Sequence, residues 1–316
     1  MKILCIGEAL IDMICTDTGF SLDKGDHFLK KPGGAPTNVA AAIASLGGTV
    51  LLAAKVGNDP FGKQLINTMK DFGVATELMF EDPDHFTTCA FVSLLQDGQR
   101  DFVFNRGADG HLTEEEIETI DLKDFSIIHF GSATGFLKAP LQKAYLSLLN
   151  RGNDEKKFIS FDPNHRQLLF PQGNESFIKQ SWHFLKNCNF FKLSDDEALL
   201  ITKTKKISEA ATILSSETNA VFTITLGKEG TMLVFNNKQI IVPSIPVKSI
   251  DSTGAGDAFV GAVLYQINKL SFEQINNLDQ TTWENIITNA NKAGGRTCEY
   301  MGAMEAFKHL NLSIFN

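Results

Sequence analysis

A glycine-rich turn that carries an aspartate lies at residues 250–261, which read Ile-Asp-Ser-Thr-Gly-Ala-Gly-Asp-Ala-Phe-Val-Gly. Small residues at Gly254, Ala255 and Gly256 let backbone N–H groups point outward at the start of the helix that we predict over residues 258–267. Those donors and the positive end of the helix dipole form a seat for an anion. A carboxylate at Asp257 is unfavourable there unless it takes up a proton or faces a metal. Phosphoryl transfer from ATP to an alcohol needs both a phosphate cradle and a base. The alternative is an ordinary helix N-terminus with an early aspartate.

Residues 251–257, Asp-Ser-Thr-Gly-Ala-Gly-Asp, resemble the C-terminal signature of the ribokinase-like sugar kinases, the PfkB family. In that family the last aspartate is the catalytic base and the Gly-Ala-Gly backbone is the anion hole. The resemblance therefore implies that Asp257 accepts a proton and that Gly254, Ala255 and Gly256 stabilise the developing charge.

The composition narrows the class of protein. The chain has 316 residues, 43% of them hydrophobic, and a formal net charge of −8. A core of useful size is therefore expected, and the net charge disfavours nucleic acid as a main partner because phosphate backbones need a basic face. Five scattered cysteines without a C-x-x-C pair indicate reduced thiols in the cytoplasm. We expect no signal peptide and no membrane span, since no apolar run approaches ~18 residues.

Two N-terminal stretches carry candidate sugar ligands. Residues 3–6 are expected to form a buried strand, and Asp12 interrupts the apolar run that follows. Gly33 and Gly34 then lead into an alanine-rich helix that includes Asn38 and stops at Gly47. These residues also have structural explanations: the small residues allow close packing of the helix, and Asp12 is an acidic residue at the edge of a strand. The stretch also matches the N-terminal signature of the family, in which the glycine pair, the asparagine and the first-strand aspartate contact the sugar.

Residues 57–64, Gly-Asn-Asp-Pro-Phe-Gly-Lys-Gln, fit the G-x-x-x-x-G-K part of a phosphate-binding loop. The loop needs Ser or Thr where Gln64 stands, and Pro60 removes a backbone donor. We therefore predict no Walker loop here; residues 56–62 are closer to the Val-Gly-x-Asp-x-x-Gly stretch of the family.

A hairpin is predicted from strands at residues 88–95 and 100–105 around Asp97-Gly98. With residues 14–31, residues 87–106 are expected to form a small β-sheet outside the main domain. The family has such a lid over the sugar, often used for dimerisation; an edge hairpin of the core is the alternative. Exposed apolar side chains that fit a dimer interface are Phe91, Leu94, Phe102 and Phe104. Arg106, after the hairpin, either holds a substrate oxygen or forms an ion pair. The stretch around it is similar to fructokinases and 2-keto-3-deoxygluconate kinases.

Strands and helices alternate from residue 127 onward, which predicts a parallel sheet with ligands at the carboxyl ends of its strands. One such end carries Asp-Pro-Asn-His-Arg at residues 162–166, which resembles a family motif whose arginine, here Arg166, lies near the transferring phosphate. Ser194 and Glu197 follow the next strand and resemble the Asn-x-x-Glu motif, whose glutamate organises Mg²⁺ through water. The same spacing is a capping box.

The resemblance extends to the nucleotide and to a monovalent cation. The family places a Thr-Leu-Gly-x-x-Gly turn against the nucleotide and an asparagine near the adenine; the matching residues are Thr225, Gly227, Lys228, Gly230 and Asn291. Lys228 is otherwise a solvated turn residue. A K⁺ site is implied at Asp251, Thr253 and Gly302.

These motifs together predict a single domain over residues 1–316: a ribokinase-like α/β/α sandwich with a mostly parallel central sheet and a small β-sheet lid. The resemblance implies phosphorylation of a sugar by ATP and Mg²⁺, with K⁺ as a further ion and with a homodimer formed through the lid. Fructose is the first substrate expected, and 2-keto-3-deoxygluconate, ribose and nucleosides stay open. The other classes are a non-catalytic sugar-sensing relative and a P-loop ATPase that depends on Lys63.

Overall fold

The computed structural model describes residues 1–96, 99–131 and 134–315 of the chain. The turn predicted at Asp97-Gly98 therefore lies outside the described residues.

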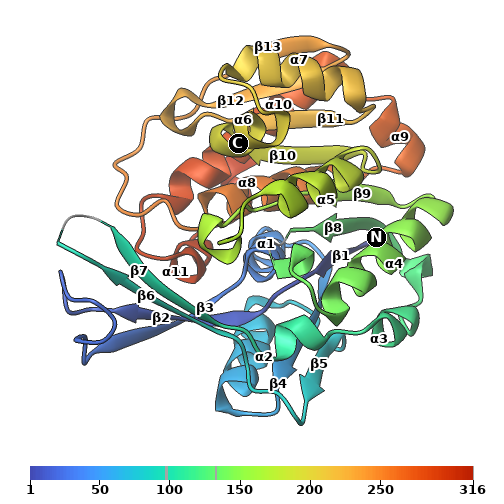
Figure 1. The fold of residues 1–316 in the computed structure, drawn as a ribbon. Coiled ribbons are helices and arrows are strands. Elements are labelled where there is room, and N and C mark those ends of the chain that lie inside the picture. Colours follow the sequence, from blue (N-terminus) through green and yellow to red (C-terminus); the bar gives the residue numbers. More distant parts are fainter. Residues whose placement is uncertain (97–98, 132–133, 316) are drawn as a thin grey trace.

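A large sheet forms the centre of the molecule (Figure 1). In the described part of the chain it has nine strands in the order β13-β12-β11-β10-β9-β8-β1-β4-β5. The strands are β1 (Lys2–Ile6), β4 (Val50–Gly57), β5 (Met79–Asp82), β8 (Phe125–Phe130), β9 (Phe158–Phe161), β10 (Phe190–Ser194), β11 (Val221–Thr225), β12 (Thr231–Phe235) and β13 (Lys238–Val242). All neighbours pair in parallel except β11–β12 and β12–β13. The hairpin of β12 and β13 therefore forms the antiparallel edge of the sheet.

Helices cover both faces of this sheet, because its strands are apolar on both faces. In β1, Ile3 and Cys5 pack into one hydrophobic core while Leu4 and Ile6 pack into the other. Helices on the first face are α1 (Ala35–Ser45), α2 (Pro60–Phe72), α8 (Ala255–Ile267), α9 (Phe272–Asn276), α10 (Gln280–Thr297) and α11 (Ala303–Phe307). Those on the second face are α3 (Glu114–Glu118), α4 (Pro140–Asp154), α5 (Glu175–Leu185), α6 (Asp195–Thr202) and α7 (Ile207–Glu217). The predicted α/β/α sandwich is confirmed.

A separate small sheet projects from one side of the sandwich, next to α11 (Figure 1). Its described strands follow the order β3-β2-β6-β7. They are β2 (Leu10–Cys15), β3 (Phe28–Gly33), β6 (Cys89–Leu94) and β7 (Arg100–Asn105). The two hairpin strands pair antiparallel, as predicted. Strands β2 and β3 reach back to Leu10 and Gly33, so the sheet begins at the edge of the main body.

One face of the small sheet carries both Asp12 and a row of apolar side chains. Asp12 and Ile14 share this face because they are two residues apart on one strand. The register places Ile14 beside Leu29 on one side and Val92 on the other, and Val92 beside Phe102. Ile14 and Leu29 are exposed.

Phe91 corrects the prediction of exposed aromatic residues in the hairpin. It points to the opposite face from Val92, because neighbouring residues of a strand alternate. There it is partly buried against the main core and contacts the ring of Phe28 edge-on. Leu94 is exposed as predicted, whereas Phe102 and Phe104 are half-buried, and their rings stack at 6.2 Å.

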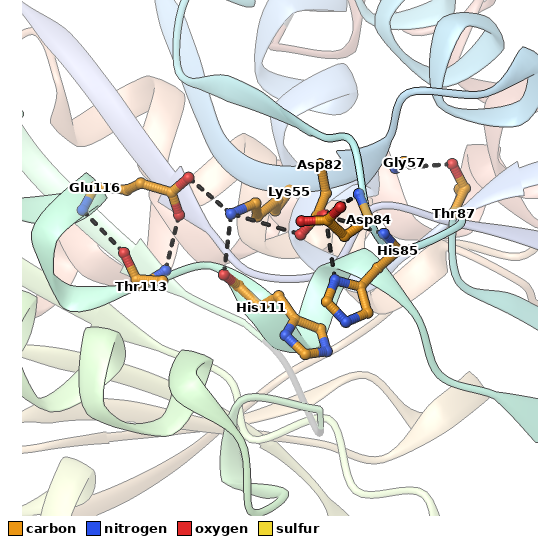
Figure 2. A network of polar contacts seen from close by, with 9 residues as sticks. All are labelled: Lys55, Gly57, Asp82, Asp84, His85, Thr87, His111, Thr113 and Glu116. Carbon is orange, nitrogen blue, oxygen red and sulfur yellow. Dashed lines mark hydrogen bonds and ion pairs between the residues drawn. The ribbon is translucent and has the colours of Figure 1, made fainter.

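A lysine network lies where the hairpin joins the main sheet (Figure 2). Lys55 of β4 donates to Glu116 of α3 at 2.8 Å and lies 3.6 Å from Asp82, the last residue of β5. His85 and His111, which flank the hairpin, stack with ring centroids 3.5 Å apart. This network ties both ends of the hairpin to the sandwich.

Candidate active site

Helix α8, which carries the predicted anion seat, starts earlier than its sequence suggests. It begins at Ala255 rather than at residue 258, so Gly256 and Asp257 belong to its first turn. Gly254 precedes the helix in the left-handed conformation, at φ 82°. A Cβ on Gly254 would lie 2.4 Å from the Cβ of Ala303. The first N–H groups of a helix have no carbonyl partner within it; here the N–H of Ala255 donates to the carbonyl of Ser252, just before the helix, at 3.2 Å.

Asp257 has the environment of a general base. Its carboxylate is buried, and Asn38 donates its Nδ2–H to Oδ2 at 2.8 Å. Burial raises the pKa of Asp257, although hydrogen bonds from Asn38 and Asn164 and the charges of Arg166 and Lys192 pull it down. The Oδ1 atom of Asn38 is buried and accepts no hydrogen bond from any described residue. A ligand hydroxyl next to Asp257 would satisfy this oxygen.

Asp12 and the glycine pair face the same region. Burial raises the pKa of Asp12 to about 6, although the charges of Arg166 and Lys31 lower it. A Cβ on Gly33 would lie 2.2 Å from Oδ2 of Asp12, so a side chain at residue 33 would displace the Asp12 carboxylate. Gly34 has φ 107°, and a Cβ there would lie 2.3 Å from the carbonyl oxygen of Glu8.

Glu8 is a site residue that the sequence did not reveal. Its buried carboxylate accepts the N–H of Ala35, at the start of α1, at 3.1 Å. It also accepts a hydrogen bond from the hydroxyl of Thr134 at 3.0 Å. Glu8 thus holds the glycine turn in place, and a glutamate right after the strand-ending Gly7 was its only signal.

Arg106 forms the ion pair that was one of its two predicted roles. Its Nε lies 3.4 Å from Oδ2 of Asp109, and its Nη2 donates to the Thr134 carbonyl at 3.0 Å. Arg106 therefore links the end of β7 to the loop that contacts Glu8. Its contact with a substrate stays a prediction.

The loop after β9 meets the start of α6. Glu197 accepts the N–H of His165 and the N–H of Ser194, both at 2.7 Å. Ser194 in turn caps the N–H of Glu197 at 3.2 Å, so the predicted capping box is confirmed. Burial acts to raise the pKa of Glu197, but Lys192 and the two N–H donors outweigh it and lower the pKa. Glu197 is thus a buried, ionised carboxylate.

Arg166 is exposed at the mouth of the site, where its Nη1 donates to the carbonyl of His165 at 3.0 Å. Its charge lowers the pKa of Asp12, Asp257 and Glu197 alike. The charge of Arg166 therefore reaches all three carboxylates, and its contact with the transferring phosphate stays a prediction.

Lys192 is the second residue that sequence reasoning missed. It lies on β10 with a side chain that is 9% exposed, and its Nζ is 3.1 Å from Oδ2 of Asp162. A Cβ on Gly256 would lie 3.3 Å from this nitrogen, so the ammonium lies directly beneath the first turn of α8. A lysine inside the apolar run Phe-Phe-Lys-Leu at residues 190–193 was the available signal.

The residues predicted for the nucleotide lie at the end of β11, in the turn to β12. Thr225 ends the strand, Gly227 and Lys228 are exposed, and Gly230 at φ 108° packs against the carbonyl of Val242. No bound nucleotide is needed to hold this turn, because Leu226 donates its N–H to Gly230 at 2.8 Å.

Asn291, in contrast, has a structural environment. It is buried in α10, where it accepts from Thr231 at 2.6 Å and donates to the carbonyls of Val242 and Pro243. Its amide holds the edge hairpin against α10. A contact with adenine would require these hydrogen bonds to be exchanged.

The residues predicted for K⁺ are brought together behind the anion seat. Asp251 accepts the N–H and hydroxyl of Thr253 at 3.0 and 2.7 Å, and the N–H of Gly302 at 2.8 Å. The loops at residues 251–253 and 298–302 thus form one unit. Within the described ranges, no group of three or more His, Cys, Asp or Glu side chains is arranged to hold a metal ion.

The P-loop alternative conflicts with the start of α2. Asp59 accepts the N–H groups of Phe61 and Gly62 at 2.8 and 2.9 Å, so a carboxylate already occupies this helix N-terminus. Lys63 is exposed on the helix. A phosphate would be repelled here. No helix in the described part of the chain has the length and apolarity to cross a membrane.

Comparisons with known proteins agree with this geometry. The profile of the pfkB family carbohydrate kinases matches residues 1–310. Probable fructokinase-5 of Arabidopsis thaliana is 36% identical over 272 residues, which cover 84% of this chain and 83% of that protein. The fructokinase of Xylella fastidiosa with bound ATP superposes with a TM-score of 0.88 at 29% identity, covering 99% of this chain and 96% of the other. A double-mutant fructokinase of Vibrio cholerae O395, solved with fructose, ADP and potassium, gives 0.85 at 29% identity over the same shares, 99% and 96%. The chain belongs to the pfkB family of carbohydrate kinases.

Proposed function

We propose that this protein is a fructokinase, which transfers the γ-phosphate of ATP to a hydroxyl of fructose. The observation that carries the proposal is the buried Asp257 carboxylate bonded to Asn38 in the first turn of α8. It combines a base, a hydroxyl acceptor and an anion seat at one point. Fructose is supported by the fructokinases to which the chain is similar.

The residues divide the reaction between them. Asp12, the Gly33–Gly34 backbone and Asn38 orient the sugar, and Asp257 accepts the proton from its reacting hydroxyl. The N–H groups at Gly254, Ala255 and Gly256 stabilise the developing negative charge, together with Arg166. The turn at residues 225–230 holds the nucleotide. When bound, Mg²⁺ would offset the phosphate charge, and Glu197 would orient it through water.

We further propose a K⁺ site at the Asp251–Thr253 and Gly302 loops and a homodimer formed through the small sheet. The apolar row at Ile14, Leu29 and Val92 supports the dimer, because Ile14 and Leu29 are exposed. This lid would lie over the sugar, since Asp12 shares its face. A cytoplasmic location is supported by the free, buried thiols of residues 5 and 188.

A substrate panel tests the function. ADP release from Mg²⁺-ATP is measured with fructose, 2-keto-3-deoxygluconate, ribose, glucose and adenosine, each with and without K⁺. We expect strong turnover on fructose and stimulation by K⁺. Preferred turnover on another sugar would replace fructose, whereas calorimetric sugar binding without any turnover would identify a sugar-sensing relative.

Fructose binding should weaken in acid because of Asp12. Its pKa is raised from 3.8 to about 6, so its carboxylate takes up a proton as the pH falls through that value and loses an acceptor for the sugar. We expect the calorimetric dissociation constant for fructose to rise below about pH 6 in the wild type. Asp12→Asn should bind fructose weakly at every pH from about 5 to 8 and lack this acid limb. A wild-type constant that stays flat over this range would remove Asp12 from the sugar site.

A further inference from the structure

We propose that Lys192 is a positioning residue for phosphoryl transfer, whose ammonium fixes the Asp162 loop and supplies a permanent positive charge beneath the first turn of α8. The inference rests on the proposed kinase function. It assigns to the strand behind the anion seat a role that the site motifs do not include.

The contacts place Lys192 between two parts of the site. Its Nζ lies 3.1 and 3.4 Å from the two carboxylate oxygens of Asp162. Asp162 begins the loop that carries Asn164 and Arg166, and its Oδ1 accepts the N–H of Asn164 at 3.3 Å. On its other side the ammonium reaches Gly256, where an added Cβ would lie 3.3 Å away. One side chain therefore connects the Asp162 loop to the anion seat.

The charges around Lys192 explain why a cation is needed there. Three buried carboxylates surround Lys192, and the negative charge of each raises the pKa of its amine: Asp162, Glu197 and Asp257. Burial alone would lower the pKa of Lys192, but these three carboxylates outweigh it and raise the pKa, so the amine stays charged. An arriving phosphate adds negative charge to this acidic region. A preorganised cation offsets that charge without reorganisation during the reaction.

The same cation acts on the base. Asp257 is faced by Asn38 from α1, by Asn164, Arg166 and Asp162 from the loop after β9, and by Lys192 from β10. Arg166 and Lys192 both lower the pKa of Asp257, and the effect of Arg166 is the larger. Arg166 is exposed to solvent and counterions, however, whereas Lys192 is the buried positive charge. Loss of the Lys192 charge should therefore raise the pKa of Asp257 further, which moves the active, ionised base to higher pH.

A matched control, Lys55, distinguishes a role of Lys192 in phosphoryl transfer from a purely structural role. Lys55 is also a strand lysine with a buried ion pair, with a side chain 11% exposed and Asp82 and Glu116 as partners (Figure 2). It lies at the root of the hairpin, outside the site. Removing either lysine leaves a buried carboxylate without its cation and should lower stability to a similar extent.

The experiment compares Lys192→Met, Lys192→Arg and Lys55→Met. For Lys192→Met we expect kcat on fructose to fall about 10²-fold, with little change in the fructose KM. The acid limb of its kcat–pH profile, where kcat falls as Asp257 takes up a proton, should move to higher pH. Lys192→Arg should recover part of kcat and restore the limb, because it keeps the charge. Lys55→Met should have a lower melting temperature than the wild type, but the same kcat and the same acid limb. An unshifted limb in Lys192→Met, or an equal shift in Lys55→Met, would overturn the proposal.

Two further measurements keep the inference testable on its own. Carboxyl ¹³C NMR titration of Asp257 needs no turnover, so it reports on Lys192 even if the wild type phosphorylates no sugar, an outcome that would defeat only the proposed function. We expect a higher Asp257 pKa in Lys192→Met, and an unchanged one would refute the inference. If Lys192→Met does not fold, Lys192→Gln removes the charge but can still donate a hydrogen bond to Asp162, so it should fold and show the raised Asp257 pKa.

Discussion

Asp257→Asn is expected to lower kcat on fructose by about 10²- to 10⁴-fold, because the amide cannot accept the hydroxyl proton. Binding should persist, since the amide oxygen can still accept the hydrogen bond that Asn38 donates at 2.8 Å. Steady-state ADP release at saturating ATP measures kcat, and calorimetry measures the fructose and ATP dissociation constants. The expected pattern is lost turnover with both ligands bound.

The stability of Asp257→Asn shows whether its loss of kcat comes from the missing base or from damage to the fold. Burial raises the pKa of Asp257 in the folded state, so its ionised form is disfavoured there and lowers stability above the folded pKa. Asparagine removes that buried charge, and the melting temperature at neutral pH should stay equal or rise. Asp279→Asn is the control, since Asp279 caps α10 by accepting the Thr282 N–H at 2.8 Å and is exposed. It should leave kcat unchanged. Turnover close to wild type in Asp257→Asn would exclude Asp257 as the base.

The sequence predicted the parts of the site that depend on local pattern. Glycines at residues 33, 34 and 254 occupy positions where a side chain would clash or where φ is positive, and their spacing was visible. The Ser194–Glu197 capping box also follows from spacing alone. The start of α8 could not be predicted from spacing, because Gly256 is a poor helix former and the sequence around it is typical of a loop.

Residues that act across the fold were harder to predict. Lys192 lies on β10 and Asp162 directly follows the neighbouring strand β9, so their pairing follows from the order of the sheet, which periodicity does not specify. Glu8 contacts Ala35 and Thr134 from distant parts of the chain. For Asn291 the motif predicted a contact with the adenine, but in the structure its amide holds β12 and β13 against α10. Local spacing thus identifies backbone requirements, while side-chain partners require the topology.

Gly254→Ala should lower kcat about 10²- to 10³-fold, the loss typical of a displaced oxyanion donor. Gly254 lies at φ 82°, where alanine is disfavoured by about 1–2 kcal/mol. The added Cβ would also lie 2.4 Å from the Cβ of Ala303 and 3.0 Å from its Cα. Because the Cα of Ala303 belongs to the backbone of α11, the first turn of α8 must move instead. Its N–H donors would then miss the charge that they stabilise.

Gly73→Ala separates this displacement from backbone strain. Gly73 ends α2 in the same left-handed region, at φ 86°, and a Cβ there would meet no described atom within 4 Å. Both variants should lose stability from the unfavourable φ, measured as the midpoint of urea unfolding, and Gly254→Ala should lose more because of its clash with Ala303. Only Gly254→Ala should lose kcat, and its fructose dissociation constant should change little, because Asp12, Gly34 and Asn38 lie on other elements. If Gly254→Ala kept wild-type kcat, the first turn of α8 would not be the anion hole, and the phosphate would have to be stabilised by Arg166 and the Asp162 loop instead.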